Sequence, residues 1–418
     1  MLSLFLCFGF VLARDYHPSP TGSCESLQLV VDLVNSNPFG DVSAFDLVCD
    51  SGYRHFVAAR DFKKGQMLAW VDRSHLFGTN NLPNQMSYDL HNHHLRDQAH
   101  ILNFLLEKKK GQFSHHSIYL NHLPDVVNTQ SHPFFWSQEA LHAISGTSAY
   151  SDLEESKRNT ILAYHDALSH ISGAARFEGE FSDEAILEAS LLVNSRVFAI
   201  GSDIVHNVLV PIFDIFNHAD PDSESINVLV HNEMEEPLQR MTCSASRDIK
   251  KGEEIRNTYG AHSNFELLQI YGFTLPNNKR DTLRIPFQDA SGRSKAFIAK
   301  RWMLGNNGND LNLVAFLREV VTPDMMDQPE VVQQTCRAVG QSAKTNRASI
   351  TEKFNNNFSS LEQFSPPVVG IIESEVTLLD TVADLVLDCI STEVALLKQQ
   401  VKMALQIESA LERSKAEL

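Results

Sequence analysis

Runs of apolar residues with regular spacing divide the chain into short helices and strands. Residues 27–34 place apolar and polar positions as a short amphipathic helix does. Two strand-like runs follow at 56–59 and 67–71, and the turn-rich segment 60–65 joins them. This pattern predicts a β-hairpin near the start of the chain.

Helical periodicity marks three longer segments. In residues 87–111, leucine and isoleucine recur on one face, and three lysines lie near the end that cations prefer. Residues 181–198 begin with Ser182, which we expect to be the N-cap. Apolar residues at i, i+3, i+4 and i+7 predict a long helix over 376–401, broken near Ser391-Thr392.

The remaining segments suggest where a second region begins. Residues 226–231 and 239–245 alternate as strands do, and 284–286 looks like a last strand. The composition shifts from Asn277, and helical periodicity then dominates. We expect a polar connection at 355–367 and a helical C-terminal region.

An apolar stretch at residues 2–13 opens the chain. It is too short to span a bilayer as a helix. Its length and the small residue Ala13 are typical of a signal peptide, although no Lys or Arg precedes it. We expect residues 1–16 to direct secretory (endoplasmic reticulum) or plastid-type targeting. A buried N-terminal strand is the alternative, with a cytoplasmic protein. No other stretch predicts a membrane span.

The most informative stretch spans residues 210–273. An apolar run at 210–218 contains three polar residues, Asp214, Asn217 and His218. A capped turn leaving the core would also explain the last two. Further on, Tyr259-Gly260 follows a strand-like piece, and Tyr271-Gly272-Phe273 ends a helix-like piece. Taken alone, these tyrosines are better explained as core aromatics with a hydrogen-bonded hydroxyl.

The composition excludes some classes of partner. The 418 residues are 43% hydrophobic, and the net charge is −17. A nucleic-acid-binding protein needs a basic face, so we expect no nucleic-acid partner. The acidity is compatible with a basic peptide or protein segment as partner.

The cysteines and histidines predict no metal site. The six cysteines contain no C-x-x-C pair. Free buried thiols are the favoured interpretation, and a Cys24–Cys49 disulfide in an oxidising compartment is the alternative. Five histidines lack the spacing of a metal site and are expected to be solvated at the surface. They are His91, His93, His94, His115 and His116.

The order and spacing of these motifs resemble the SET-domain protein methyltransferases. The resemblance is strongest to the branch typified by the Rubisco large-subunit lysine methyltransferase. Its motifs here are Asn217-His218, Tyr259-Gly260, Tyr271-Gly272-Phe273, Tyr119-Leu120-Asn121-His122-Leu123-Pro124, Trp136-Ser137 and Ser195-Arg196-Val197-Phe198.

The resemblance implies an α+β fold with three parts. A β-rich SET domain with a pseudoknot would occupy residues 27–275, with a helical insert at about 80–190. An all-α domain resembling the substrate-binding domain of this branch would follow at 276–418. A monomer is expected.

The resemblance also implies S-adenosylmethionine as cofactor and a lysine of a non-histone protein as methyl acceptor. Tyr259 would be the catalytic residue. The implied cofactor-binding residues are Arg54, Ser195, Arg196, Asn217, His218, Tyr259, Tyr271 and Phe273. The implied substrate-binding residues are Asp214, Arg196 and Tyr271. For Arg196, an ion pair with Asp214 is the structural alternative to cofactor contact.

One departure from the family pattern keeps other functions open. The usual Gly-x-Gly aligns with Tyr53-Arg54-His55, and side chains there restrict close approach of backbone to a cofactor. A catalytically impaired SET-fold peptide-binding or scaffold protein is therefore one alternative. A protein-histidine methyltransferase is another. His262 stands where the histidine-modifying relative carries Arg, which mildly favours lysine.

Overall fold

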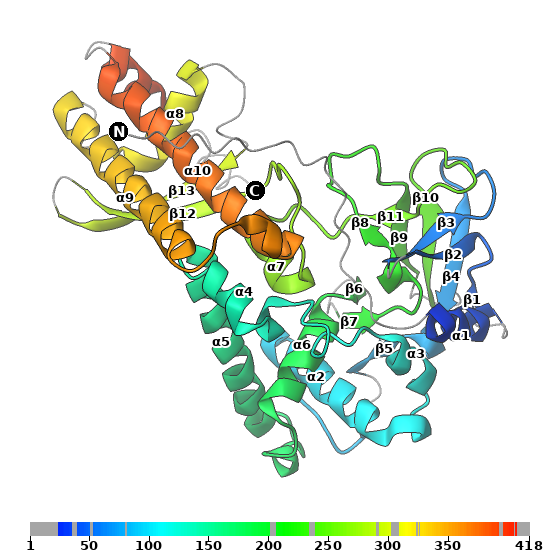
Figure 1. Ribbon diagram of the computed structural model, residues 1–418. Helices are drawn as coiled ribbons and strands as arrows, with labels where there is room; N and C mark the ends of the chain where they lie inside the picture. The colour runs from blue at the N-terminus through cyan, green and yellow to red at the C-terminus, as the bar shows by residue number, and fades with distance from the viewer. Residues whose placement is uncertain are drawn as a thin grey trace.

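The computed structural model describes most of the chain. The described residues are 24–35, 40–50, 53–79, 82–200, 206–233, 239–289, 292–301, 309–322, 325, 327–392, 396–404, 406 and 407. The expected targeting segment at 1–16 lies outside them. Figure 1 shows a β-rich region at one end, C-terminal helices at the other, and further helices between them.

Short strands in several small sheets build the β-rich region. They are β1 (Gly40–Asp41), β2 (Phe45–Asp50), β3 (Tyr53–Ala58), β4 (Met67–Asp72), β5 (Phe77–Gly78), β6 (Val197–Ile200), β7 (His206–Leu209), β8 (Asn217–His218), β9 (Val228–Glu233), β10 (Arg240–Ala245) and β11 (Arg256–Asn257). The largest sheet has the order β1-β4-β10-β9, and β5-β7-β6 forms another. Helix α1 (Cys24–Asn35) covers the predicted 27–34.

The predicted hairpin is wrong in its pairing, although both strands exist. β3 pairs with β2, whereas β4 pairs with β1 and β10. The connection between β3 and β4 is longer than the two to five residues or so of an ordinary hairpin loop. It turns instead towards a second loop, where the Phe62 and Ile249 backbones exchange hydrogen bonds of 2.9 and 3.0 Å.

A parallel pair of two-residue strands lies at the centre of the region. β8 runs beside β11, with Asn217 opposite Arg256 and His218 opposite Asn257. Parallel strands need a crossover connection, and the β9–β10 hairpin occupies that connection here. Two chain segments far apart in sequence thus meet at Asn217-His218.

Helices dominate the insert between β5 and β6. They are α2 (His93–Lys110), α3 (Ser117–His122), α4 (Gln138–Ala143), α5 (Ser148–His170) and α6 (Asp183–Asn194). The Ser182 cap is confirmed, since its side chain accepts from the Ala185 amide. Of the five histidines expected at the surface, His116 is instead buried, with its ring 5.0 Å from that of Phe77.

The C-terminal region is mainly helical, as expected, but it opens with a hairpin. Strands β12 (Thr282–Gln288) and β13 (Ser294–Lys300) pair antiparallel, so the expected last strand has a partner after it. Helices α8 (Asn309–Val320), α9 (Pro329–Asn355) and α10 (Pro366–Ser391) follow, and α9 lies beside α10 (Figure 1). The predicted break at Ser391-Thr392 is confirmed by the end of α10.

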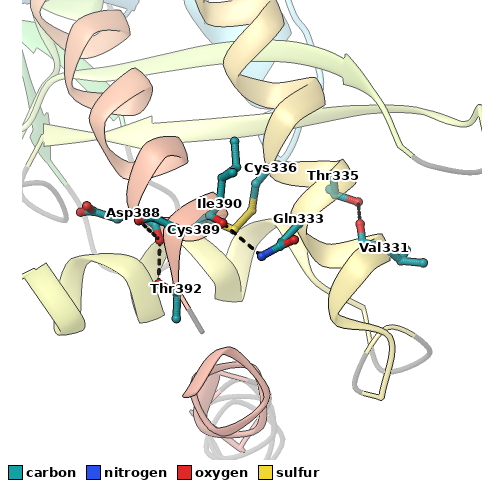
Figure 2. Close-up of a disulfide and its surroundings, with 9 residues drawn as sticks. Val331, Gln333, Thr335, Cys336, Asp388, Cys389, Ile390 and Thr392 are labelled. Carbon is teal, nitrogen blue, oxygen red and sulfur yellow. Dashed lines mark hydrogen bonds between the residues drawn. A yellow bond between two sulfur atoms is a disulfide. The ribbon is translucent and has the colours of Figure 1, made fainter. Parts of the chain in front are cut away.

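The expectation of free thiols is wrong for four cysteines. Cys24 of α1 bonds to Cys49 of β2, which is the alternative pairing. Cys336 of α9 bonds to Cys389 of α10 across the interface of the two helices (Figure 2). Neither pair shares a C-x-x-C motif, so only tertiary packing reveals them. Cys243 remains a buried free thiol.

None of the described helices is both long and apolar enough to cross a membrane. Among the described side chains, no group of three or more His, Cys, Asp or Glu is arranged to hold a metal ion.

Candidate active site

The site is built around the segment that leads into β8. Phe213 and Phe216 are about 1% exposed, and their rings stack with centroids 5.4 Å apart, so both belong to the core. Ile212 has φ of 79°, a conformation that a β-branched side chain rarely adopts. Such strain persists only where the surroundings enforce it, and it often accompanies functional sites. Ile212 is the N-cap of the short helix η6 (Phe213–Ile215), which carries Asp214.

Asp214 is fully buried and holds two partners. Its Oδ2 accepts the Tyr119 hydroxyl at 2.9 Å and lies 3.4 Å from Arg196 Nη1. The same Arg196 nitrogen donates to the Asp214 carbonyl at 3.0 Å. The ion pair considered as an alternative for Arg196 is therefore present. It leaves other nitrogens of that guanidinium free to bind elsewhere.

Arg54 is the middle residue of Tyr53-Arg54-His55, the segment that replaces the usual Gly-x-Gly, and its side chain is buried. It is 6% exposed, and its Nη1 donates to the His122 carbonyl at 3.2 Å. Burial, followed by the repulsion of Arg196, lowers the pKa of Arg54 to about 10, and Asp214 partly opposes this. Arg54 therefore remains a cation at neutral pH. The side chain fills space that a glycine-rich segment would leave open.

Tyr259 is held by two hydrogen bonds. Its hydroxyl donates to the Phe216 carbonyl at 2.8 Å, and its backbone amide donates to His218 Nδ1 at 3.0 Å. Burial raises the pKa of the Tyr259 hydroxyl, so this group is a neutral phenol. Because its proton is committed to a carbonyl, the oxygen can still accept a hydrogen bond from another group.

An aromatic cluster surrounds this hydroxyl. The Tyr259 and Tyr271 ring centroids are 4.6 Å apart, and the His218 and Phe273 centroids are 5.9 Å apart. Tyr271 ends helix α7 (Asn264–Tyr271), and Gly272 follows as its left-handed cap with φ of 80°. A side chain at Gly272 would meet the Ser131 carbonyl at 2.9 Å. The glycine thus allows the tight turn that places Tyr271 and Phe273 together.

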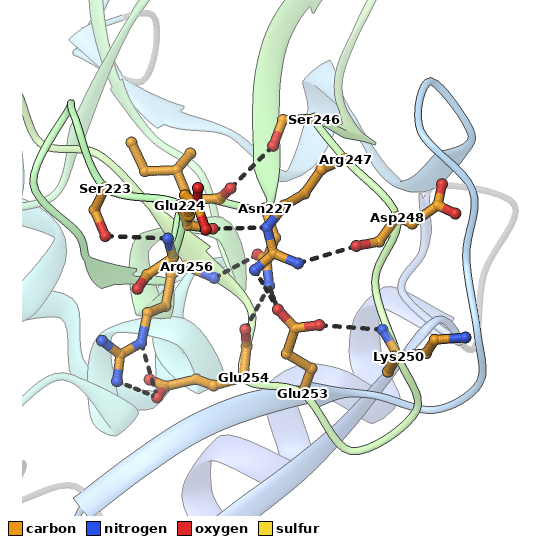
Figure 3. Close-up of polar contacts among 12 residues, drawn as sticks. Ser223, Glu224, Asn227, Ser246, Arg247, Asp248, Lys250, Glu253, Glu254 and Arg256 are labelled. Atoms are coloured by element: carbon orange, nitrogen blue, oxygen red, sulfur yellow. Dashed lines mark hydrogen bonds and ion pairs between the residues drawn. The ribbon is translucent and has the colours of Figure 1, made fainter.

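The β8–β11 pair is fastened by buried polar groups. Asn227 is 0% exposed; its side chain donates to the Glu254 carbonyl at 2.6 Å and accepts the Arg256 amide at 2.9 Å (Figure 3). Asn217 donates to Glu254 Oε1 at 2.9 Å, and Glu254 also pairs with Arg256 at 2.7 Å. The Asn217 side-chain amide therefore helps to hold the β8–β11 pair together.

Eight of the nine residues singled out from the sequence line one pocket. These eight are Arg54, Ser195, Arg196, Asp214, Asn217, Tyr259, Tyr271 and Phe273. The ninth, His218, lies behind Tyr259. Burial lowers the pKa of His218 to about 4, so the ring is neutral and its Nδ1 can accept the Tyr259 amide.

Sequence reasoning assigned no role to Tyr119, His122 or His132. Tyr119 binds Asp214, and its ring lies 5.0 Å from that of His122. His132 lines the pocket and accepts the Phe134 amide on Nδ1, while its Nε2 lies 2.8 Å from the Gln269 carbonyl. The 119–124 motif marked the right segment, but only the fold brings it beside Asp214.

Four buried polar atoms of this cluster have no protein partner in the described structure. They are Arg54 Nε, Arg196 Nε, His122 Nε2 and Asp214 Oδ1. Buried polar groups are normally satisfied. Two guanidinium donors and one carboxylate acceptor suit a ligand that carries both a carboxylate and an ammonium group, as the amino-acid part of S-adenosylmethionine does. The residues present therefore fit this cofactor.

Comparisons with known proteins agree with this geometry. The SET domain family model matches residues 54–260. The chain is 27% identical over 295 residues to Protein SET DOMAIN GROUP 40 of Arabidopsis thaliana, covering 62% of this chain and 58% of that protein.

Two methyltransferases are also similar to the chain. Ribosomal lysine N-methyltransferase set10 of Schizosaccharomyces pombe is 28% identical over 187 residues, covering 43% of this chain and 32% of that protein. Actin-histidine N-methyltransferase of Danio rerio is 24% identical over 256 residues, covering 58% of this chain and 41% of that protein. The chain thus spans well under two thirds of the length of these relatives.

Solved structures extend the likeness over nearly the whole chain. The SET domain of LSMT bound to lysine and AdoHcy matches with a TM-score of 0.66 at 15% identity, covering 90% of this chain and 95% of that one. Rubisco LSMT bound to AdoMet matches with a TM-score of 0.63 at 15% identity, covering 87% and 92%. Residues 54–260 are thus identified as a SET domain, and the chain has the α+β fold of Rubisco LSMT, with a helical C-terminal region.

Proposed function

We propose that this protein is an S-adenosylmethionine-dependent protein-lysine N-methyltransferase that acts on a non-histone protein. The observation that carries the proposal is the pocket itself. It gathers buried cationic and anionic groups at Arg54, Arg196 and Asp214 next to an aromatic cluster with one hydrogen-bonded phenol. The charged groups suit the amino-acid part of the cofactor, and the aromatic cluster suits an acceptor amine.

The chemistry assigns distinct tasks to these residues. When bound, S-adenosylmethionine supplies an electrophilic methyl group. The chain must hold the acceptor amine in line with that methyl and keep water away. Tyr259 is fixed by the Phe216 carbonyl and accepts a hydrogen bond from the amine through its oxygen. Its raised pKa suits it to orienting the amine and not to removing a proton.

The aromatic cluster has the properties that a lysine channel needs. A lysine near its ordinary pKa of about 10.4 is protonated at neutral pH, and desolvation between rings lowers that pKa. The rings of Tyr259, Tyr271 and Phe273 also stabilise the methylammonium product through cation–π contact. Their centroids lie 4.6 to 6.4 Å apart, so they form one continuous surface.

Protein-histidine methylation is the second candidate, because relatives with that printed name are similar to this chain. A histidine acceptor is already neutral at physiological pH and needs a donor or acceptor for its second ring nitrogen. The rings of Tyr271 and Phe273 lie beside that of Tyr259, with centroids 4.6 and 6.4 Å away. The neighbouring His262 contacts the Tyr259 carbonyl at 3.0 Å. This arrangement favours lysine.

The test measures binding and transfer with the full chain. We expect micromolar binding of S-adenosylmethionine by calorimetry, and His218→Ala should weaken it at least about tenfold by releasing the Tyr259 backbone. Tyr259→Phe should keep binding within about threefold but slow transfer on the order of 100-fold, the usual cost of a misplaced reactant.

Amino-acid analysis of proteins labelled by a methyl-labelled cofactor identifies the acceptor. Methyllysine supports the proposal, and methylhistidine would replace it by the second candidate. A well-folded protein that binds no cofactor would leave the peptide-binding or scaffold interpretation.

A further inference from the structure

The side chains that line the pocket carry more positive than negative charge. The residues with charged side chains that line the pocket are Arg54, Arg196 and Asp214. His122 and His132 lie beside them, but burial lowers their pKa values to about 4 and about 3, so both are neutral. Burial raises the pKa of Tyr119, which is neutral too. One positive charge is therefore left uncompensated.

Arg54 contributes the unbalanced charge. Asp214 lies 3.4 Å from Arg196 and accepts from Tyr119, so its Oδ2 is already engaged. The partner of Arg54 is the His122 carbonyl, which is a dipole without net charge. The Arg54 Nε is buried and has no partner. Asp214 attracts Arg54 but already pairs with Arg196, so a second buried guanidinium with 6% exposure is unfavourable unless a ligand supplies another negative charge.

We propose that Arg54 is the second guanidinium of a carboxylate-binding subsite, and that it pairs with Arg196 to hold the α-carboxylate of the cofactor's amino-acid part. This inference rests on the proposed function, and it assigns recognition of the cofactor's α-carboxylate to Arg54. Arg54 lies where the family pattern has Gly-x-Gly. In this chain a side chain would therefore contact the cofactor at a position where the backbone would otherwise approach it.

The donor geometry suits a carboxylate. A guanidinium presents a planar fork that matches two carboxylate oxygens, and such charge-assisted bonds are among the strongest in proteins. Arg54 Nε and Arg196 Nε are both buried donors without partners. Asp214 Oδ1, also without a partner, is a neighbouring acceptor for the ammonium group of the same amino acid. An acidic side chain of the protein substrate is the other source of a carboxylate.

The test compares two ligands that differ only in that group. Calorimetric titration of the full-length protein uses S-adenosylmethionine and its decarboxylated analogue, without any peptide. The wild-type protein should prefer the carboxylated ligand. Arg54→Met should reduce this preference roughly 10- to 100-fold, the range for a hydrogen bond to a charged group, and it should do so by weakening S-adenosylmethionine alone.

Two further variants separate charge from shape. Arg54→Gln can still donate to the His122 carbonyl but lacks the charge, and it should lose the preference as Arg54→Met does. Arg60→Met is the matched control, because Arg60 is exposed just after β3, the strand that carries Arg54, and lies over the Phe62 ring at 5.1 Å. It should leave the affinity for both ligands unchanged.

Three outcomes would overturn the inference. If Arg54→Met and Arg54→Gln weaken both ligands equally, Arg54 only supports the fold. If both keep the wild-type preference, the carboxylate is held without Arg54, and a substrate carboxylate is the remaining occupant. If the folded wild-type protein binds neither ligand, the proposed function fails as well, which distinguishes that case from the first two.

Discussion

His132 shows how one buried side chain can join two segments of the site. Its Nδ1 accepts the Phe134 amide at 3.2 Å, and its Nε2 donates to the Gln269 carbonyl at 2.8 Å. Only the neutral ring with a proton on Nε2 satisfies both bonds. Burial accordingly lowers the pKa of His132 from 6.5 to about 3.

This arrangement predicts a pH-dependent stability. Between about pH 6.5 and pH 3, the unfolded chain binds a proton at His132 that the folded chain does not. The free energy of unfolding should therefore fall as the pH is lowered through this window, by up to about 1.4 kcal/mol per pH unit for one histidine. His132→Asn, which keeps an acceptor for the Phe134 amide, should make the dependence shallower.

Urea unfolding at several pH values between 4 and 7 would measure this slope. His170→Asn is the control, because its side chain is 58% exposed and should leave the slope unchanged. An equal slope in wild type and His132→Asn would show that folding does not lower the pKa of His132.

At the residue scale, motifs predicted which residues line the pocket but not how they bind one another. Asn217, Tyr259 and Tyr271 could be named because each sits in a short motif. The Tyr119–Asp214 bond joins residues 95 positions apart, and no local pattern encodes it. Arg54 was singled out at a departure from the pattern. That its side chain points inward depends on packing.

At the element scale, helices were easier to predict than strand partners. The Ser182 cap and the end of α10 near Ser391 follow from local chemistry, and both were found. Alternation identifies a strand but says nothing about which strand lies beside it. β3 and β4 therefore pair elsewhere, and β8, only two residues long, could be recognised only through its motif.

The two longest C-terminal helices carry the next prediction. Cys336 and Cys389 are both 0% exposed and join α9 to α10 across 53 positions (Figure 2). Closing a loop of this size restricts the unfolded chain, which typically contributes about 2–4 kcal/mol. A reductant should therefore lower the melting temperature of the protein.

Paired variants assign this effect to the disulfide between α9 and α10. Cys336→Ala/Cys389→Ala should lower the melting temperature by itself and reduce the further effect of reductant. Cys24→Ala/Cys49→Ala keeps the α9–α10 bond and should remain sensitive. A double variant as stable as wild type would contradict a stabilising role. The effect on melting is measured by calorimetry with and without reductant.

At the scale of the whole molecule, the insert and the C-terminal region are joined by a buried carboxylate. Glu375 of α10 is 6% exposed and accepts the Ser148 and Ala149 amides at 2.9 and 3.0 Å. These amides open α5, whose own N-cap Thr147 makes no side-chain cap bond. The negative charge also favours the positive end of the helix dipole. A residue of one region therefore caps a helix of the other.

Removing this cap should weaken the contact between the two regions. Glu375→Ala leaves the Ser148 amide and the buried Ala149 amide without their acceptor, which should lower the free energy of unfolding by about 1–3 kcal/mol. Glu375→Gln keeps one acceptor oxygen and should cost less. Hydrogen exchange should rise at the first turn of α5, because the amides freed there belong to Ser148 and Ala149. Glu373→Ala, exposed on the same helix, should change neither quantity. If Glu375→Ala exchanged as slowly as wild type at these amides, the Glu375 carboxylate would not be what protects the first turn of α5.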